Sequence, residues 1–271
     1  MIRKTSTALA VTALTVGLTA CGSSDNKKAS INGFTPREAG YLTVGTELPD
    51  PPFVLGANTV DDITDKGYEV EMVNEMAKRL GNLKVKWVSF PFTGLVAGAP
   101  CPCDFDVNGV SIFPDRAKKV DFSSGYFTAQ QAVVVKKGTN VATRAEVKGL
   151  RLGVTADSSG AFFVENDLKP ARAARVYKNP TLLKLALSAG QIDAGITDAP
   201  IALDFQSKST NLAVIGRFQS SLPEEYGAVL KKGSPNTAAV TTTINALKDD
   251  GFFTRLEAKY FPAQVKIPTL K

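Results

Sequence analysis

Arg116 is the residue whose type and position most clearly indicate a chemical role. Pro114 suits the first position of a helix, because its ring fixes φ and its missing N–H would have had no partner there. Arg116 then falls in the first turn, where the helix dipole disfavours a cation by roughly 0.3–1 kcal/mol. A bound anion beside the helix start and the guanidinium would remove this penalty. The alternative is a solvated arginine paired with Asp115 or Asp121.

Carboxylates provide the opposite charge elsewhere in the chain. Asp198 in GITDAP follows a predicted strand, and open α/β sheets bind ligands beyond the carboxyl ends of their strands. The alternative for Asp198 is an Asx turn ahead of Pro200. Glu47 and Asp50 in VGTELPDPPF form a second acidic loop, although Asp50 could simply open the Asp-Pro-Pro turn in solvent.

The composition excludes several chemistries. The 271 residues include no histidine, which removes Ser-His-Asp and Cys-His catalysis and the commonest metal ligand. The formal net charge of +6 is spread among acids, so nucleic acid is not an expected partner. Cys101 and Cys103 form either a disulfide or two free thiols, and no histidine or third cysteine completes a metal site. We expect no cofactor and no metal.

The N-terminus predicts where the protein works. Residues 1–20 contain a basic start, a short apolar stretch and small residues before Cys21, and they resemble a bacterial lipoprotein signal peptide. That resemblance implies cleavage before Cys21 and attachment of lipid, including palmitate, to its sulfur and amine. The alternative is an ordinary secretory signal or a membrane-anchoring helix. Residues 21–40 are predicted to be a flexible tether, so the protein is expected to be extracytoplasmic and anchored to the cell membrane, on its periplasmic side or at the cell surface.

Two matched halves must position these side chains. YLTVGTE and LRLGVTA are both short apolar strands followed by a polar loop and a helical segment, and apolar residues recur at helical spacing in EVEMVNEMAKRLG. Such alternation predicts parallel sheets in two lobes. YFTAQQAVVVKKG and SSLPEEYGAVLKKG are predicted crossover segments. We therefore assign residues 41–128 and 224–271 to lobe 1 and residues 129–223 to lobe 2.

Five motifs in register carry a family resemblance: TVGTELPDPPF, GYEVEMVNEMAKRLG, GVSIFPDRAKKVDFSSGYF, AGQIDAGITDAP and ALKDDGFFTRLEAKYF. The chain resembles the polar amino-acid family (family 3) of extracytoplasmic solute-binding proteins of ATP-binding cassette importers. The resemblance implies a two-lobed periplasmic-binding-protein-like α/β fold (type II) with two crossover strands as its hinge. It implies capture of an amino acid, delivery to a membrane permease and no catalysis, and we expect a monomer. Alternatives are a dehydratase-like enzyme on the same fold and a ligand sensor that docks on a membrane receptor.

The resemblance also assigns roles to residues. Arg116 matches the arginine that grips the ligand α-carboxylate, and Asp198 matches the acid that receives the α-ammonium. Gly109 and Ser111 match strand-end residues that hold the same groups. A zwitterion bridging Arg116 and Asp198, on opposite lobes, would then favour closure.

The second-lobe loop contributes Ser158 and Ser159, which the resemblance places near the ligand carboxylate and which could equally cap a helix. Two positions depart from the family pattern. Phe113 stands where a helix-capping threonine is usual, and Asp157 replaces a usual glycine, which reshapes the loop or adds a charge.

The loop after the first strand bears on ligand identity. Asp50 stands where many family members place an aromatic lid, while Phe92 and Phe53 remain as apolar walls, with Phe53 also suited to the core. Two unpaired acids, Glu47 and Asp50, near a closing cleft are costly unless a cation joins them. This favours a basic amino acid as the ligand.

Overall fold

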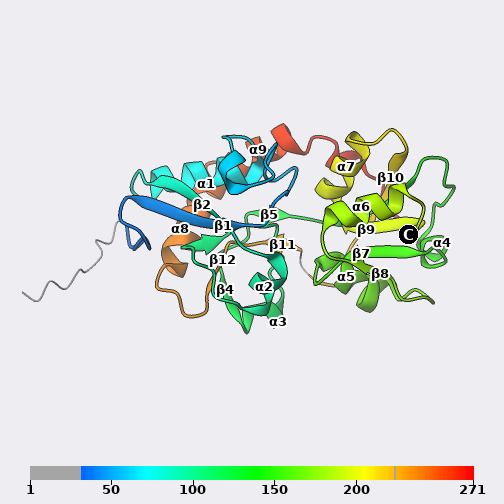
Figure 1. The fold of residues 1–271 in the computed structure, drawn as a ribbon, viewed down its shortest axis with the longest axis horizontal. Helices are drawn as coiled ribbons and strands as arrows, with labels where there is room; N and C mark the ends of the chain where they lie inside the picture. The colour runs from blue at the N-terminus through cyan, green and yellow to red at the C-terminus, as the bar shows by residue number, and fades with distance from the viewer. Residues whose placement is uncertain (1–31, 223) are drawn as a thin grey trace, which may run out of the picture.

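The computed structural model describes residues 32–222 and 224–271, which form two α/β lobes lying side by side along the long axis of the molecule (Figure 1). Within these residues, no helix is both long enough and apolar enough to cross a bilayer. Residues 1–31 lie outside this range, and with them the predicted signal peptide and Cys21.

The first lobe is built on a five-stranded sheet in the order β2-β1-β3-β12-β4. Its elements are β1 (Tyr41–Thr46), η1 (Val60–Asp62), α1 (Tyr68–Arg79), β2 (Lys84–Ser89), α2 (Phe92–Ala97), β3 (Phe105–Asp106), α3 (Pro114–Ala117), β4 (Val120–Phe122), β12 (Val229–Lys231), α8 (Thr237–Asp249) and α9 (Phe252–Tyr260). The apolar stripe predicted from the sequence buries α1 against this sheet, since Val73 and Met76 have no exposed surface.

The second lobe contains a sheet in the order β10-β6-β9-β7-β8. Its elements are β6 (Gln131–Lys136), α4 (Arg144–Lys148), β7 (Leu152–Thr155), α5 (Ser159–Phe163), the π-helical segment η2 (Val164–Leu168), β8 (Arg175–Tyr177), α6 (Pro180–Ser188), β9 (Ala194–Asp198), α7 (Ala199–Ser207) and β10 (Leu212–Phe218). Side chains on the two faces of this sheet form two separate apolar clusters, as expected for a sheet covered by helices on both sides.

The prediction of parallel sheets is wrong for the strands that follow each crossing. β1 pairs in parallel with β2 and β3, but β12 runs antiparallel to β3 and β4. Similarly, β7 is parallel to β8 and β9, whereas β6 is antiparallel to β9 and β10. The physical reason is that β6 and β12 enter their sheets directly from the other lobe, without the helical crossover that makes neighbouring strands parallel.

Two short strands join the lobes. β5 (Phe127–Thr128) and β11 (Glu225–Tyr226) pair antiparallel in a separate two-stranded sheet that lies between the lobes in Figure 1. The sequence analysis placed the crossings near Thr128 and Glu224. A pair of extended strands between two packed bodies is a suitable hinge, because few side chains must rearrange when the strands bend.

The C-terminal tail is a correction to the predicted domain assignment. After α9 and the short helix η3 (Gln264–Lys266), the chain crosses to the second lobe, where it ends (Figure 1). There Ile267 and Leu270 pack into the second-lobe cores. Arg217 and the tail exchange backbone bonds, from Arg217 N to Pro268 O at 2.8 Å and from Leu270 N to Arg217 O at 2.9 Å. Burial of these apolar side chains fixes the tail on lobe 2.

The predicted tether is also wrong for residues 32–40. Phe34 has no exposed surface and belongs to the first-lobe core. Thr35 and Asn236 exchange two hydrogen bonds of 2.9 Å each. The composition of residues 32–40 is polar and charged, so it did not indicate that the single side chain of Phe34 is buried. That burial fixes the segment against lobe 1.

Candidate ligand-binding site

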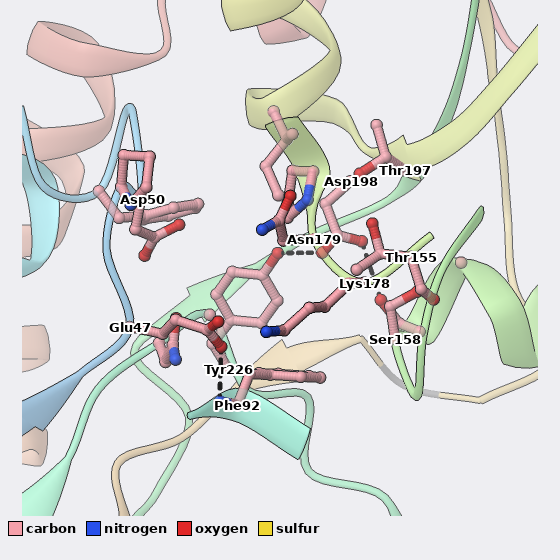
Figure 2. A pocket seen from close by; sticks show the side chains of 18 of the residues that line it. Glu47, Asp50, Phe92, Thr155, Ser158, Lys178, Asn179, Thr197, Asp198 and Tyr226 are labelled. Atoms are coloured by element: carbon pink, nitrogen blue, oxygen red, sulfur yellow. Dashed lines mark hydrogen bonds between the residues drawn. The ribbon is translucent and has the colours of Figure 1, made fainter. Parts of the chain in front are cut away.

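A pocket between the lobes gathers the predicted ligand residues (Figure 2). Its lining includes all of them except Ser111: Glu47, Asp50, Phe92, Gly109, Arg116, Ser158, Ser159 and Asp198. The first lobe contributes the loop after β1 and the start of α2. The second lobe contributes the ends of β7 and β9, so the site lies where the carboxyl ends of parallel strands from both sheets meet.

Arg116 lies buried in this pocket, with 8% of its surface exposed. Its Nη1 donates to the Ser111 carbonyl at 2.9 Å, and its Nη2 donates to the Asp157 carbonyl of the second lobe at 2.6 Å. Burial lowers the pKa of Arg116 to about 10, and the negative charge of Asp198 acts in the opposite direction. The alternative of a solvated arginine is wrong, because Asp115 pairs with Lys118 and Asp121 pairs with Lys232.

Phe113, which replaces the usual capping threonine, gives no side-chain cap to α3. Its ring instead lies under the guanidinium, with the Arg116 carbon Cζ 4.7 Å from the ring centroid. The Phe92 ring lies 5.6 Å from the same carbon. Aromatic faces near a buried guanidinium favour its charged form, because the ring quadrupole attracts a cation.

Asp198 ends β9 and is 8% exposed. Its Oδ1 accepts from Ser159 Oγ at 3.0 Å and from Gln131 Nε2 at 2.5 Å, and its Oδ2 accepts from the Tyr226 hydroxyl at 2.5 Å. The side chain makes no cap bond to α7, so the Asx-turn alternative is wrong. Burial raises the pKa of Asp198, while the three donors and the Arg116 charge act in the opposite direction.

Tyr226 and Gln131 are site residues that the sequence analysis missed. Tyr226 comes from the crossover strand β11, is fully buried, and reaches Asp198 of the other lobe, as Figure 2 shows. Gln131 lies directly opposite Asp198 in the antiparallel pair β6–β9, which places both side chains on one face of the sheet. Both residues lie in the predicted crossover segments, and this position could have indicated a role in the site, because the segments that join two lobes lie at the base of the cleft between them.

The two serines have different surroundings. Ser158 is the N-cap of α5, where its Oγ accepts from Ala161 N at 3.1 Å and donates to the Thr155 carbonyl at 2.8 Å. Its single hydroxyl proton is therefore already used. Ser159 is buried and donates to Asp198. The capping role is confirmed for Ser158, whereas direct contact of either serine with a ligand stays a prediction.

Gly109 and Ser111 follow β3. Gly109 has a φ of +55°, and its N–H donates to Glu69 Oε1 at 2.9 Å. A Cβ at Gly109 would lie 3.2 Å from the Tyr226 ring, so the close approach also favours glycine. Ser111 is buried outside the pocket lining, and its hydroxyl has no partner within the described residues. Its carbonyl accepts from Arg116 Nη1 and from Phe113 N, so Ser111 holds the arginine through its backbone.

Glu47 and Asp50 form the acidic side of the first-lobe wall (Figure 2). Glu47 Oε2 accepts from the backbone N–H of Phe92 at 2.6 Å, at the start of α2. Asp50 Oδ2 is buried and has no hydrogen-bond partner among the described residues. Burial, followed by the charges of Glu69 and Glu47, raises the pKa of Asp50 well above its ordinary value. Asp50 does open the turn, since its carbonyl accepts from Val54 N at 2.7 Å, but its side chain lines the pocket, so the alternative is wrong about solvent exposure.

Two further acids lie behind this wall. Glu69 of α1 has no exposed surface and accepts from Gly109 N and from the Tyr126 hydroxyl. Burial raises the pKa of Glu69 to about 7. Asp106 of β3 is also fully buried, neither of its oxygens has a described partner, and burial raises its pKa well above its ordinary value. The first lobe thus carries more carboxyl oxygens near the pocket than the described donors satisfy, and burial favours their protonated forms.

The disulfide question has a structural answer. Cys101 and Cys103 form a disulfide with a Cα–Cα distance of 5.2 Å. The ligand atoms of both cysteines and of Asp106 lie within 4.8 Å of one another, but the sulfurs are bonded to each other. A buried carboxylate next to a closed disulfide leaves no thiolate for a metal.

The remaining walls are apolar or basic. Phe53 is 1% exposed, packs in the first-lobe core and also lines the pocket, so it serves both roles considered for it. Lys178, Asn179 and Thr197 line the second-lobe side. Asp157 has a φ of +54°, in the left-handed region that glycine adopts readily, and its side chain is exposed.

Comparison with known proteins identifies the family to which this architecture belongs. Residues 42–263 match the model of the bacterial extracellular solute-binding proteins, family 3. The chain is 30% identical to the L-cystine-binding protein TcyA of Bacillus subtilis (strain 168), over 97% of this chain and 99% of that protein. It is 32% identical to the L-cystine-binding protein TcyJ of Escherichia coli (strain K12), over 84% of this chain and 85% of that protein.

Solved structures agree with this result. An ancestral arginine-binding protein bound to arginine is 30% identical and matches with a TM-score of 0.68, over 82% of this chain and 98% of that one. These matches confirm the predicted type II fold of two lobes and the predicted family. The chain, a substrate-binding protein with its pocket between two lobes, therefore belongs to the family 3 bacterial extracellular solute-binding proteins.

Proposed function

We propose that the protein captures an amino acid between its lobes and delivers it to the membrane permease of an ATP-binding cassette importer. The observation that carries this proposal is the pair of buried, opposite charges on the two lobes. Arg116 has no carboxylate partner among the described residues and is free to take a ligand carboxylate with its guanidinium fork. Asp198 presents a carboxylate for the ammonium.

The distal end of the ligand carries a positive charge. Asp50 has a buried oxygen that no donor in residues 32–222 or 224–271 reaches, and Glu47 lies on the same wall. A guanidinium or ammonium group would compensate both, because a buried carboxylate without a partner costs free energy that a nearby cation returns. Arginine, lysine and ornithine meet this requirement, in keeping with the similar arginine-binding protein.

L-Cystine is a second candidate, and Lys178 favours it. Cystine has a second ammonium, suited to Asp50 and Glu47, and a second carboxylate, which needs a cation of its own. Lys178 lines the same pocket from the second lobe. Two relatives at 30–32% identity are cystine-binding proteins.

Competition against a bound reporter tests the proposal with six amino acids: arginine, lysine, ornithine, cystine, glutamine and glutamate. Displacement by any member at micromolar concentration supports amino-acid binding, and no displacement by any member contradicts it. If glutamine or glutamate displaces the reporter better than arginine, lysine and cystine, the cationic distal group is wrong. A Lys178→Ala variant that weakens cystine but not arginine would select the second candidate.

We further propose that the protein is non-catalytic, monomeric and extracytoplasmic, and that it is held at the cell membrane by lipid on Cys21. The absence of histidine and the family both support a binding role. Mass spectrometry of membrane-extracted protein should find a diacyl or triacyl group on Cys21. A mature protein that begins at another residue, without lipid, would contradict the anchor and leave solute binding unaffected.

A further inference from the structure

Two buried polar side chains lie behind Asp198 without lining the pocket. Gln131 begins β6 and pairs across the sheet with Asp198. Glu224 immediately precedes β11, and its carbonyl accepts from Ala129 N at 2.9 Å. Both residues therefore belong to the segments that carry the chain between the lobes, next to the residue proposed to receive the ligand ammonium.

The Gln131 amide connects two carboxyl groups. Its Nε2 lies 2.5 Å from Asp198 Oδ1 and 2.7 Å from Glu224 Oε1, and a third, longer contact of 3.1 Å joins it to Ser159 Oγ. The exposed fractions are 0% for Gln131, 8% for Asp198 and 5% for Glu224. An NH₂ group has two hydrogens, so it can satisfy one oxygen of each carboxyl group. It supplies no positive charge, and two buried negative charges joined by a neutral amide would repel each other.

The two carboxyl groups are not equivalent. Asp198 accepts additional bonds from Ser159 and Tyr226. Among the described residues, the hydrogen bonds to the Glu224 carboxyl come from Gln131 alone. Hydrogen bonds stabilise the ionised form, so this difference favours the charge on Asp198 and the proton on Glu224.

The surroundings of Glu224 support this assignment. Burial and then the charge of Asp198 raise the pKa of Glu224 to about 8, with Asp167 of η2 acting in the same direction. Tyr226 of β11 also faces it. Arg144 donates to the Asp167 carbonyl at 2.6 Å, and its charge lowers the pKa of Asp167.

We propose that Glu224 and Gln131 are positioning residues that couple ligand binding at Asp198 to the release of a proton. The inference rests on the proposed function, because it needs a ligand that brings an ammonium group to Asp198. On binding, the O–H bond of Glu224 breaks, the electron pair stays on the carboxylate and the proton passes to water. The ligand ammonium then supplies the positive charge that the proton had supplied.

The sign of the linkage follows from this exchange. The ammonium lowers the pKa of Glu224 from about 8, so the complex binds fewer protons than the free protein in the range just below pH 8. Affinity therefore rises with pH up to about 8 and then becomes constant. We expect an increase of roughly three- to tenfold between pH 6.5 and 8.5 from this group.

The first test needs no ligand. Carboxyl ¹³C NMR of the ligand-free protein should show Glu224 titrating near pH 8, and Asp198→Asn should lower that midpoint by removing the neighbouring charge. A Glu224 midpoint near 4.5 in the wild type would overturn the inference, whatever the protein binds.

The second test is calorimetry at pH 7.5 in buffers of different ionisation enthalpy, with the tightest amino acid of the competition panel. Wild type should release more protons per ligand than Glu224→Gln, in which the pH dependence from this group disappears. Glu225→Gln is the matched control, because Glu225 is adjacent and exposed. Equal proton release in wild type and Glu224→Gln would overturn the inference, whereas absence of binding by any amino acid in wild type would overturn the proposed function instead.

Discussion

The two walls of the pocket treat their carboxylates differently. On the second lobe, Asp198 accepts from three protein donors, so its charge is compensated and its orientation is fixed. On the first lobe, Asp50 has one oxygen and Asp106 has two oxygens without a hydrogen-bond partner in the part of the chain that the structure describes. An acid whose hydrogen bonds are complete is preorganised for the α-ammonium, which every amino acid has. Acids without hydrogen-bond partners favour ligands that carry an additional positive charge.

This difference separates affinity from selectivity. Arg116 and Asp198 are held by contacts that reach across the lobes, through Asp157 and Tyr226 respectively. Loss of either should reduce binding of every amino acid. Loss of the unpaired first-lobe acid should change which amino acid is preferred. The variants below test this separation, beginning with the largest expected effect.

Arg116→Ala should weaken binding of every ligand by about 2–4 kcal/mol, because the ligand carboxylate is then buried without a charge partner. Isothermal titration calorimetry measures the loss. Lys118→Ala is the control, since Lys118 is exposed and pairs with Asp115. A loss smaller than about tenfold, or roughly 1.4 kcal/mol, would show that Arg116 does not hold the ligand.

Asp198→Asn should produce a slightly smaller loss, about 1–3 kcal/mol, because the amide keeps the shape but not the charge that attracts the ammonium. The same calorimetric panel applies, with thermal unfolding to confirm that the variant is folded. Asp193→Asn is the matched control, because Asp193 is half-buried outside the pocket and pairs with Arg151. Unchanged affinity in Asp198→Asn would remove Asp198 from the site.

Asp50→Asn should alter selectivity rather than general affinity. We expect arginine, lysine or cystine to lose about 1–2 kcal/mol, while glutamine changes little. The ligand-free variant should also melt at a higher temperature, because burial raises the pKa of Asp50 and its ionisation opposes folding. Asp61→Asn, in the exposed helix η1, is the control. Equal losses for charged and uncharged ligands would erase the contrast between the walls.

Glu69 extends the comparison to stability. Its pKa is raised from 4.5 to about 7, so the ligand-free protein binds more protons than the unfolded chain in that interval. Its free energy of unfolding should therefore fall as pH rises from about 4.5 to about 7, by up to about 3 kcal/mol from this group. Urea unfolding across this range should show a smaller decrease in Glu69→Gln. Glu225→Gln is the control and should show the same decrease in unfolding free energy as wild type. An equal decrease in Glu69→Gln would contradict the prediction, because Glu69 would then be ionised over the whole range.

The structure brings Arg116 and Asp198, two residues selected from the sequence, to one pocket, but the sequence did not indicate the partners that hold them. Arg116 and Asp198 stand in local motifs, and each motif marks the end of a strand. Tyr226 and Gln131 could not be found this way, because their roles arise only when β11 and β6 meet the end of β9 in space. Phe34 and Leu270 were misassigned for a similar reason, since one apolar side chain in a polar segment gives no periodic signal.

The smallest effect concerns two adjacent serines that the sequence could not distinguish. Ser158 caps α5 and already donates its proton to Thr155, so Ser158→Ala should cost about 1 kcal/mol of stability with little change in affinity. Ser159 donates to Asp198, so Ser159→Ala should leave stability nearer to wild type and weaken binding severalfold, because Asp198 is less firmly oriented. Thermal unfolding and calorimetry on the two variants measure both quantities. If Ser158→Ala weakens binding more than Ser159→Ala does, the ligand carboxylate competes for the hydroxyl of Ser158. The second-lobe side of the pocket would then be less preorganised than its hydrogen bonds indicate.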